Sequence, residues 1–225
     1  MITFREFMQE ATWIHKQNLN LYPLYSTEEN LSADQIAALR ESEAGIKSGS
    51  AALIQDCADG GIASERLFLR CGSCTSDCLD RLWGRCRFVA ETKNDLLSLD
   101  QMAAQHLKTG HLEAIALSLL SESCDAAHFS ERNIAEFSKW VRFSKSLAVR
   151  GIFMDCRVDG NSCSLVKKRF SLIKQIRSDM PCLFSYFCLE GLLQPLSHGD
   201  EDLLETLKML SSLNDTSFYA RFYIQ

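Results

Sequence analysis

The second half of the chain alternates between helical patterns and short apolar runs, and this rhythm restricts the fold more than any other feature. The runs "AIALSLL" and "CLFSYFCL" have the length and composition of strands that are buried on both faces. Amphipathic segments such as "SERNIAEFSKWVRFSKSLA" separate these runs. Connections of that length join parallel strands. The pattern therefore predicts an α/β protein with a parallel sheet.

The number of predicted strands decides between the architectures that such a sheet allows. Strands are expected in "RLFLRC", "HLEAIALSLLSE", "VRGIFMDCRVDG", "PCLFSYFCLEG" and "FYARFYIQ". A full eight-fold barrel needs about 250 residues, and this chain has 225. We therefore expect a partial (β/α) barrel or a five-stranded parallel sheet in an α/β domain over residues 60–225.

Residues 1–59 have the pattern of an N-terminal helical segment. Apolar residues recur at helical spacing in "ITFREFMQEATWIHK", and Ser32 is a plausible N-cap for a second helix. The stretch between them, "NLNLYPLYSTEEN", contains a proline and is expected to be a loop. "DGGIA" then ends the helical pattern.

Charge and hydropathy exclude some classes of partner. The net charge of −5 argues against a general nucleic-acid binder, and no run of eighteen apolar residues is present to span a membrane. The N-terminus lacks the uninterrupted apolar core of a signal peptide. We therefore expect a cytoplasmic protein with ten reduced cysteines, acting on a small-molecule ligand or a protein partner.

Four of the cysteines are clustered in "RCGSCTSDCLDRLWGRCRF": Cys71, Cys74, Cys78 and Cys86. Two thiolates spaced as Cys71-x2-Cys74 can bind one metal ion, and the other two complete a four-fold ligand set for zinc or an iron–sulfur cluster. Paired C-x2-C motifs are the usual zinc pattern, whereas the second pair here is C-x7-C. The alternative is that these cysteines bind no metal and are small buried apolar side chains.

The segment "GSCTSDCLDR" resembles the cluster loop of radical S-adenosylmethionine enzymes, in particular the biotin-synthase-like branch. That resemblance implies a [4Fe–4S] cluster and S-adenosylmethionine as cofactors. Cys74 and Cys78 match the first two ligands of the family's C-x3-C-x2-C motif, and Asp77 stands where that branch often has an acidic residue. Arg81 occupies the position of the third ligand, so another cysteine of the loop would have to replace it.

Carboxylates follow three of the predicted strands. Glu122, Asp155 and Glu190 lie at or just beyond the carboxyl ends of these strands, the edge at which α/β proteins bind ligands. We therefore predict that they contact a cofactor or substrate. The sequence lacks G-x-G-x-x-G, G-x4-G-K-[ST] and G-x-S-x-G, which removes dinucleotide, P-loop and α/β-hydrolase functions.

Three functional hypotheses follow. The first is a radical-enzyme-like protein with an iron–sulfur cluster in the cysteine-rich loop. The second is a non-catalytic binding or interaction protein, with structural zinc or no metal. The third is a metal-free α/β enzyme that uses the strand-end carboxylates.

Overall fold

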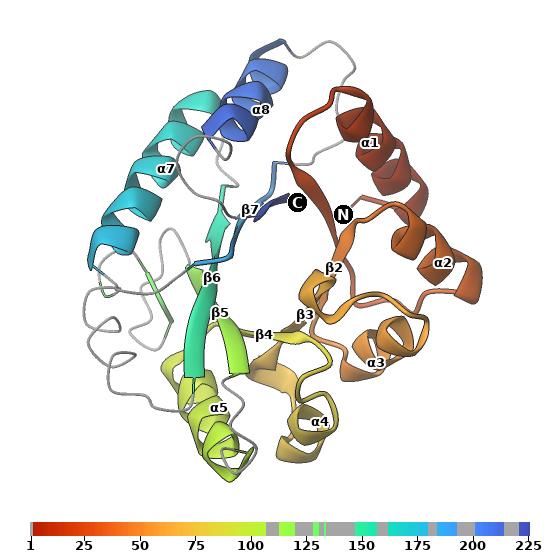
Figure 1. The fold of residues 1–225 in the computed structure, drawn as a ribbon, viewed down its shortest axis with the longest axis vertical. Helices are drawn as coiled ribbons and strands as arrows, with labels where there is room; N and C mark the ends of the chain where they lie inside the picture. Colours follow the sequence, from red (N-terminus) through yellow and green to blue (C-terminus); the bar gives the residue numbers. More distant parts are fainter. Residues whose placement is uncertain are drawn as a thin grey trace.

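The computed structural model describes residues 2–106, 113–119, 128–130, 133, 147–156, 162–179, 184–192, 201–213 and 221–225. Its centre is a closed barrel of parallel strands that follow one another in sequence order around the ring (Figure 1). The strands are β1 (Tyr22–Ser26), β2 (Gly45–Ser48), β3 (Leu67–Arg70), β4 (Arg87–Ala90), β5 (Glu113–Leu119), β6 (Leu147–Asp155), β7 (Tyr186–Glu190) and β8 (Arg221–Ile224). Pairing of Tyr22 with Tyr223 closes the ring between β1 and β8.

Helices surround the barrel on its outside (Figure 1). They are α1 (Phe4–Lys16), α2 (Ala33–Glu41), α3 (Ala51–Asp59), α4 (Ser76–Arg81), α5 (Lys93–His106), α7 (Ser162–Asp179) and α8 (Glu201–Leu213), with short 3-10 turns η1 (Ser64–Arg66) and η2 (Cys71–Ser73). Thr3 and Ser32 start α1 and α2 with complete capping boxes, which confirms the N-cap predicted at Ser32. No helix in the described part of the chain is both long and apolar enough to cross a membrane.

Side-chain alternation along the strands divides the core into two parts. One set of side chains points outward and packs against the helices, as Ile46, Leu69 and Phe187 do. The other set fills the inside of the barrel and centres on Phe68, whose ring lies 5.0 Å from that of Tyr223 and 5.3 Å from that of Phe153. The inner set comprises Leu24, Phe68, Val89, Ala116, Phe153, Tyr186, Cys188 and Tyr223. The barrel is therefore a packed core rather than a pore.

The parallel α/β class is confirmed, but the expectation of a partial barrel or a five-stranded sheet is wrong. The five predicted strands correspond to β3, β5, β6, β7 and β8, and the structure adds β1, β2 and β4. Residues 1–59, where we expected helices and a loop between them, contribute the first two strands. Each added strand has four or five residues, as the predicted β3, β7 and β8 do. The added strands were missed because they adjoin helical or cysteine-rich sequence, where a short apolar run does not stand out.

Candidate functional site

The carboxyl ends of the strands meet at one end of the barrel, because all the strands run in the same direction. Charged residues gather there from elements that are far apart in sequence. They are Glu28, Lys47, Arg70, Glu91, Asp155 and Glu190, and we call this set the mouth. The mouth is the candidate functional site.

A buried ion pair lies at the centre of the mouth. The Lys47 ammonium on β2 contacts the Glu190 carboxylate on β7, and the two residues are only 5% and 7% exposed. The Lys47 nitrogen also lies 5.0 Å from the centroid of the Phe153 ring, a favourable cation–π position. Burying two charges is costly unless each has a partner. Here each charge is the partner of the other, and the pair joins β2 to β7 inside the barrel.

A second group of charges lies nearer to solvent. Arg70, at the end of β3, pairs with Glu28 and approaches Glu91 at 4.0 Å. Glu28 also accepts hydrogen bonds from the Gly49 backbone N–H at 2.9 Å and from the Ser48 hydroxyl at 3.1 Å. Partial burial acts to raise the pKa of Glu28, but these hydrogen bonds and the Arg70 charge outweigh it and hold that pKa below its ordinary value.

Asp155 and Glu190 are neighbours on adjacent strands. The two residues are register partners of β6 and β7, and the Cys156 N–H donates to the Glu190 carbonyl at 2.8 Å. Burial, reinforced by the charge of Asp155, raises the pKa of Cys156 to about 12. Burial and Glu190 likewise raise the pKa of Cys188. Both thiols therefore stay protonated at neutral pH, and neither has the thiolate character of a nucleophile.

The predicted ligand-contacting carboxylates have different outcomes. Asp155 and Glu190 lie side by side in the mouth, and their contact with a ligand stays a prediction. Glu122 lies outside the described residues. The sequence analysis missed Lys47 and Arg70. The signal for Lys47 was weak: a single lysine in "GIKSG", among small and apolar residues that favour burial.

The four clustered cysteines have separate surroundings. Cys71 and Cys86 are buried in the core between barrel and helices. The Cys74 thiol donates to the Arg70 carbonyl at 3.4 Å, and burial raises its pKa to about 11. At Cys78 the sulfur accepts a hydrogen bond from the Arg81 guanidinium at 3.4 Å. Hydrogen bonds from Thr75 and Arg81 lower the pKa of Cys78. Nowhere in the described ranges do three or more His, Cys, Asp or Glu side chains form a group that could hold a metal ion.

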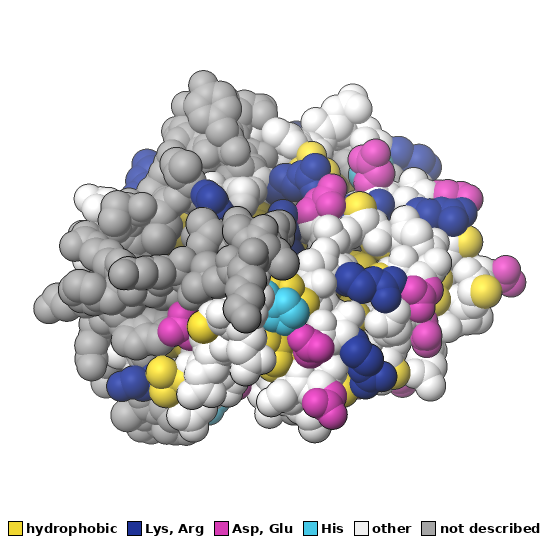
Figure 2. All heavy atoms as spheres, turned by 60° about the horizontal axis from the view of Figure 1, so that its bottom comes forward, with side chains coloured by type: hydrophobic (Ala, Val, Ile, Leu, Met, Phe, Trp, Pro, Cys, Tyr) yellow, Lys and Arg dark blue, Asp and Glu magenta, His cyan; other side chains and the backbone are white. Residues whose placement is uncertain are grey.

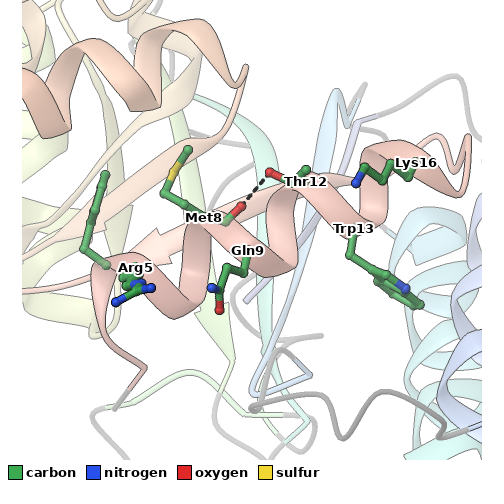
Figure 3. A pocket seen from close by; sticks show the side chains of 7 residues that line it. Arg5, Met8, Gln9, Thr12, Trp13 and Lys16 are labelled. Atoms are coloured by element: carbon green, nitrogen blue, oxygen red, sulfur yellow. Dashed lines mark hydrogen bonds between the residues drawn. The ribbon is translucent and has the colours of Figure 1, made fainter.

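Two further surface features lie away from the mouth. A hollow follows the outer face of α1, and the side chains that line it come from that helix alone, among them Met8, Trp13 and Lys16 (Figure 3). On the face seen in Figure 2, the described Lys and Arg side chains are interspersed with Asp and Glu side chains. Neither feature brings together groups from different elements as the mouth does.

No family model and no curated protein sequence matches the chain, but solved structures have the same fold. Diaminopimelate decarboxylase from Helicobacter pylori complexed with L-lysine is 12% identical, with a TM-score of 0.76 over 99% of this chain and 61% of that one. The arginine decarboxylase of Paramecium bursaria Chlorella virus bound to agmatine is 9% identical, with a TM-score of 0.74 over 99% and 61%. AQ1208 from Aquifex aeolicus is 17% identical, with a TM-score of 0.72 over 97% and 55%. At these identities the likeness concerns the fold alone, and the chain spans between 55% and 61% of the length of these three structures.

The resemblance to radical S-adenosylmethionine enzymes is therefore wrong. The fold is instead similar to the barrel domain of amino-acid decarboxylases. The first two strands that we predicted, in "RLFLRC" and "HLEAIALSLLSE", are β3 and β5 of the barrel. At the position of the missing third ligand, Arg81 binds the Cys78 sulfur. Because the described residues form no group of three or more metal-binding side chains, they do not support an iron–sulfur cluster with S-adenosylmethionine.

Proposed function

We propose that this barrel binds a small molecule carrying one or more amino groups at its mouth. The observation that carries the proposal is the excess of negative charge among the strand-end side chains: four carboxylates, Glu28, Glu91, Asp155 and Glu190, face two cations, Lys47 and Arg70. An end of a barrel with a net negative charge attracts ligands of the opposite sign. Structures with the same fold were solved with L-lysine and with agmatine, both of which carry such groups.

The related decarboxylases depend on pyridoxal phosphate (PLP), so the mouth must be tested against that cofactor. PLP is held through a lysine amine and through an acidic or arginine partner of its ring nitrogen. Lys47 is the one buried lysine among the described residues, and its amine lies in direct contact with the Glu190 carboxylate. A pyridine ring between these two groups would have to break their contact. In the arrangement seen here the pair does not fit PLP, and we derive no chemistry through it.

Binding would begin at the outer carboxylates. An approaching ammonium group meets Glu28 and Glu91, which Arg70 holds in place. Asp155 lies deeper, beside the Lys47–Glu190 pair. A ligand with a second polar group would reach that inner pair, whose carboxylate and ammonium are already fixed by each other. The mouth thus favours amines over neutral molecules of the same length.

Titration calorimetry with agmatine and 1,4-diaminobutane tests the proposal, with 1,4-butanediol as the neutral ligand of matched length. We expect saturable binding of the amines and none of the diol. D155N and E91Q should each weaken amine binding by roughly tenfold, since a hydrogen bond to a charged group contributes about 1.5–3 kcal/mol. D59N makes the same charge change on α3, where Asp59 pairs with Arg85, and should leave the affinity unchanged, as should C78S.

Two results would contradict the proposal. One is a wild-type protein that binds neither amine, and the other is an equal loss of affinity in D155N and D59N. Incubation with PLP followed by borohydride reduction and mass spectrometry tests the cofactor separately. We expect no increase in mass at Lys47, and a PLP adduct on this residue would show that the Lys47–Glu190 contact opens to admit the cofactor.

A further inference from the structure

The amino-terminal end of the barrel, opposite the mouth, contains a cavity of about 370 Å³. Its walls come from the first residues of several strands, namely Arg87 of β4, Tyr186 of β7 and Arg221 of β8, and from Glu65 in η1. Small-molecule sites begin at about 300 Å³, so this cavity is large enough for a small metabolite. We call it the basal pocket.

Aromatic rings hold the guanidinium groups of the basal pocket in place. The Arg87 guanidinium lies 4.7 Å from the centroid of the Tyr186 ring, and the Arg221 guanidinium lies 5.5 Å from that of Tyr22. Such stacking fixes the plane of a guanidinium while leaving its N–H groups available at the edge. The two arginines are therefore oriented before any ligand arrives.

The positive charge of the pocket is only partly compensated. Arg221 lies 3.9 Å from the Glu65 carboxylate, whereas the described residues place no carboxylate within ion-pair distance of Arg87. The Arg87 Nε–H is buried and has no hydrogen-bond acceptor in the described part of the chain. A buried donor without an acceptor lowers stability unless something accepts its hydrogen bond.

The nearby Arg66 shows how this fold satisfies a guanidinium when it has only a structural role. Arg66 lies in η1 and donates to the backbone carbonyls of Leu39, Arg40 and Ala44. Its donors are therefore used within the protein. Arg87 has no comparable set of acceptors, although its strand begins at the same end of the barrel.

We propose that the basal pocket binds a small molecule through an oxyanion, a carboxylate or phosphate group held by Arg87 and Arg221. Guanidinium groups pair with both anions through two parallel N–H···O hydrogen bonds. The bound oxyanion would pair with the edge of the guanidinium that lines the pocket, and it would accept from the buried Arg87 Nε–H once the guanidinium turns toward it. The Tyr223 hydroxyl donates to the Glu65 carbonyl at 3.2 Å and so holds η1 against the pocket. This site is separate from the mouth and takes ligands of the opposite charge.

Titration calorimetry with inorganic phosphate and with succinate, each against wild-type protein, tests this site. We expect saturable binding of at least one anion, and the tighter of the two identifies the group as phosphate or carboxylate. R87Q should weaken binding at least about tenfold, and R221Q should also weaken it. R85Q removes an arginine that pairs with Asp59 on the outer surface and should leave the affinity unchanged. Absence of saturable binding by both anions, or an equal affinity in wild type and R87Q, would overturn the proposal.

A spectroscopic measurement on the wild-type protein keeps the test decisive if R87Q does not fold. The Arg87 Nε–H signal in a ¹⁵N–¹H correlation spectrum, assigned by its loss in R87K, should shift during the anion titration and saturate with the calorimetric affinity. An Arg87 signal that does not move while anion binds elsewhere would overturn the proposal. Agmatine should leave this signal unchanged, so failure of the basal pocket and failure of the mouth are separate results.

Discussion

The two ends of the barrel treat buried charge in different ways. At the mouth, charges pair across strands: Lys47 with Glu190, and Arg70 with Glu28. At the basal pocket, arginines stack on tyrosine rings, and Arg87 has no carboxylate partner among the described residues. An ion pair has no net charge and can stay buried without a ligand. A buried hydrogen-bond donor without an acceptor is stabilised when a ligand supplies the acceptor.

This difference indicates what each end requires from its surroundings. At the mouth, the inner ion pair is a fixed structural unit, and the outer carboxylates supply the net attraction for cations. At the basal pocket, the attraction is for anions, and the site has an unsatisfied donor of its own. The two ends of the barrel therefore carry net charges of opposite sign. Variants at each end distinguish effects on the free energy of unfolding from effects on ligand affinity.

The largest expected effect comes from breaking the inner pair of the mouth. K47M leaves the Glu190 carboxylate buried without its partner, and such a change lowers the free energy of unfolding by about 3–5 kcal/mol. Urea denaturation at neutral pH measures it. The double variant K47M/E190M replaces both charges with apolar side chains and should recover most of the loss, because buried pairs are often replaceable by packed apolar groups.

A K47M protein as stable as the wild type would contradict the contrast between the two ends of the barrel. Glu190 would then be solvated, and Lys47 and Glu190 would not form a buried pair. The surface pair Arg85–Asp59 provides the control, because its side chains are 39% and 59% exposed. R85Q should change the free energy of unfolding by no more than about 1 kcal/mol.

A smaller effect is expected at the opposite end. Gly151 on β6 faces Tyr186, and a Cβ atom at this position would lie 1.9 Å from the Tyr186 ring. G151A must therefore displace the ring on which Arg87 stacks, and overpacking of this kind lowers the free energy of unfolding by about 1–3 kcal/mol. Thermal or urea denaturation measures the loss, and anion binding should weaken in parallel.

The matched control for G151A is G72A, because a Cβ at Gly72 would meet its nearest atom, an Asp95 carboxylate oxygen, only at 4.0 Å. We expect G72A to unfold as the wild type does. If G151A also kept both its stability and its anion affinity, the Tyr186 ring would not be fixed by packing, and the preorganised basal pocket would be disproved.

The sequence predicted the α/β class because five of its strands carry local apolar patterns. The missed strands depend on distant partners. Pro23 lies within "YPLYS", a stretch that reads as a loop, yet it forms part of β1 by pairing with Ile224 of β8. β2 is a four-residue strand between two helical patterns. Closure of the ring is a non-local property that periodicity cannot reveal.

The same limit applies to the site residues. Glu190 was predicted because it ends an obvious strand. Lys47 was missed because its importance comes from a contact with Glu190, 143 positions away. The cysteine spacing was misleading because spacing does not state where side chains point: Cys71 and Cys86 face the core, whereas the Cys78 sulfur contacts Arg81.

The smallest expected effect concerns the outer charges of the mouth and depends on pH. Glu28 has a lowered pKa in the folded protein because the Gly49 and Ser48 hydrogen bonds and the Arg70 charge outweigh partial burial. A carboxyl group with a folded-state pKa below its unfolded value stabilises the protein at pH values above the unfolded pKa, and this stabilisation is lost as the pH falls through the folded pKa.

The variant E28Q tests this, because its amide side chain cannot titrate. At pH 7 it should therefore be less stable than the wild type, by no more than about 1 kcal/mol because the Arg70 and Glu28 side chains are 37% and 48% exposed. The difference should shrink as the pH falls below about 4. Urea denaturation of both proteins, with about one measurement per pH unit between pH 3 and pH 7, shows whether their free energies of unfolding converge. A constant difference over that range would mean that Glu28 acts through its shape rather than its charge, and charge pairing would then not distinguish the outer mouth from the basal pocket.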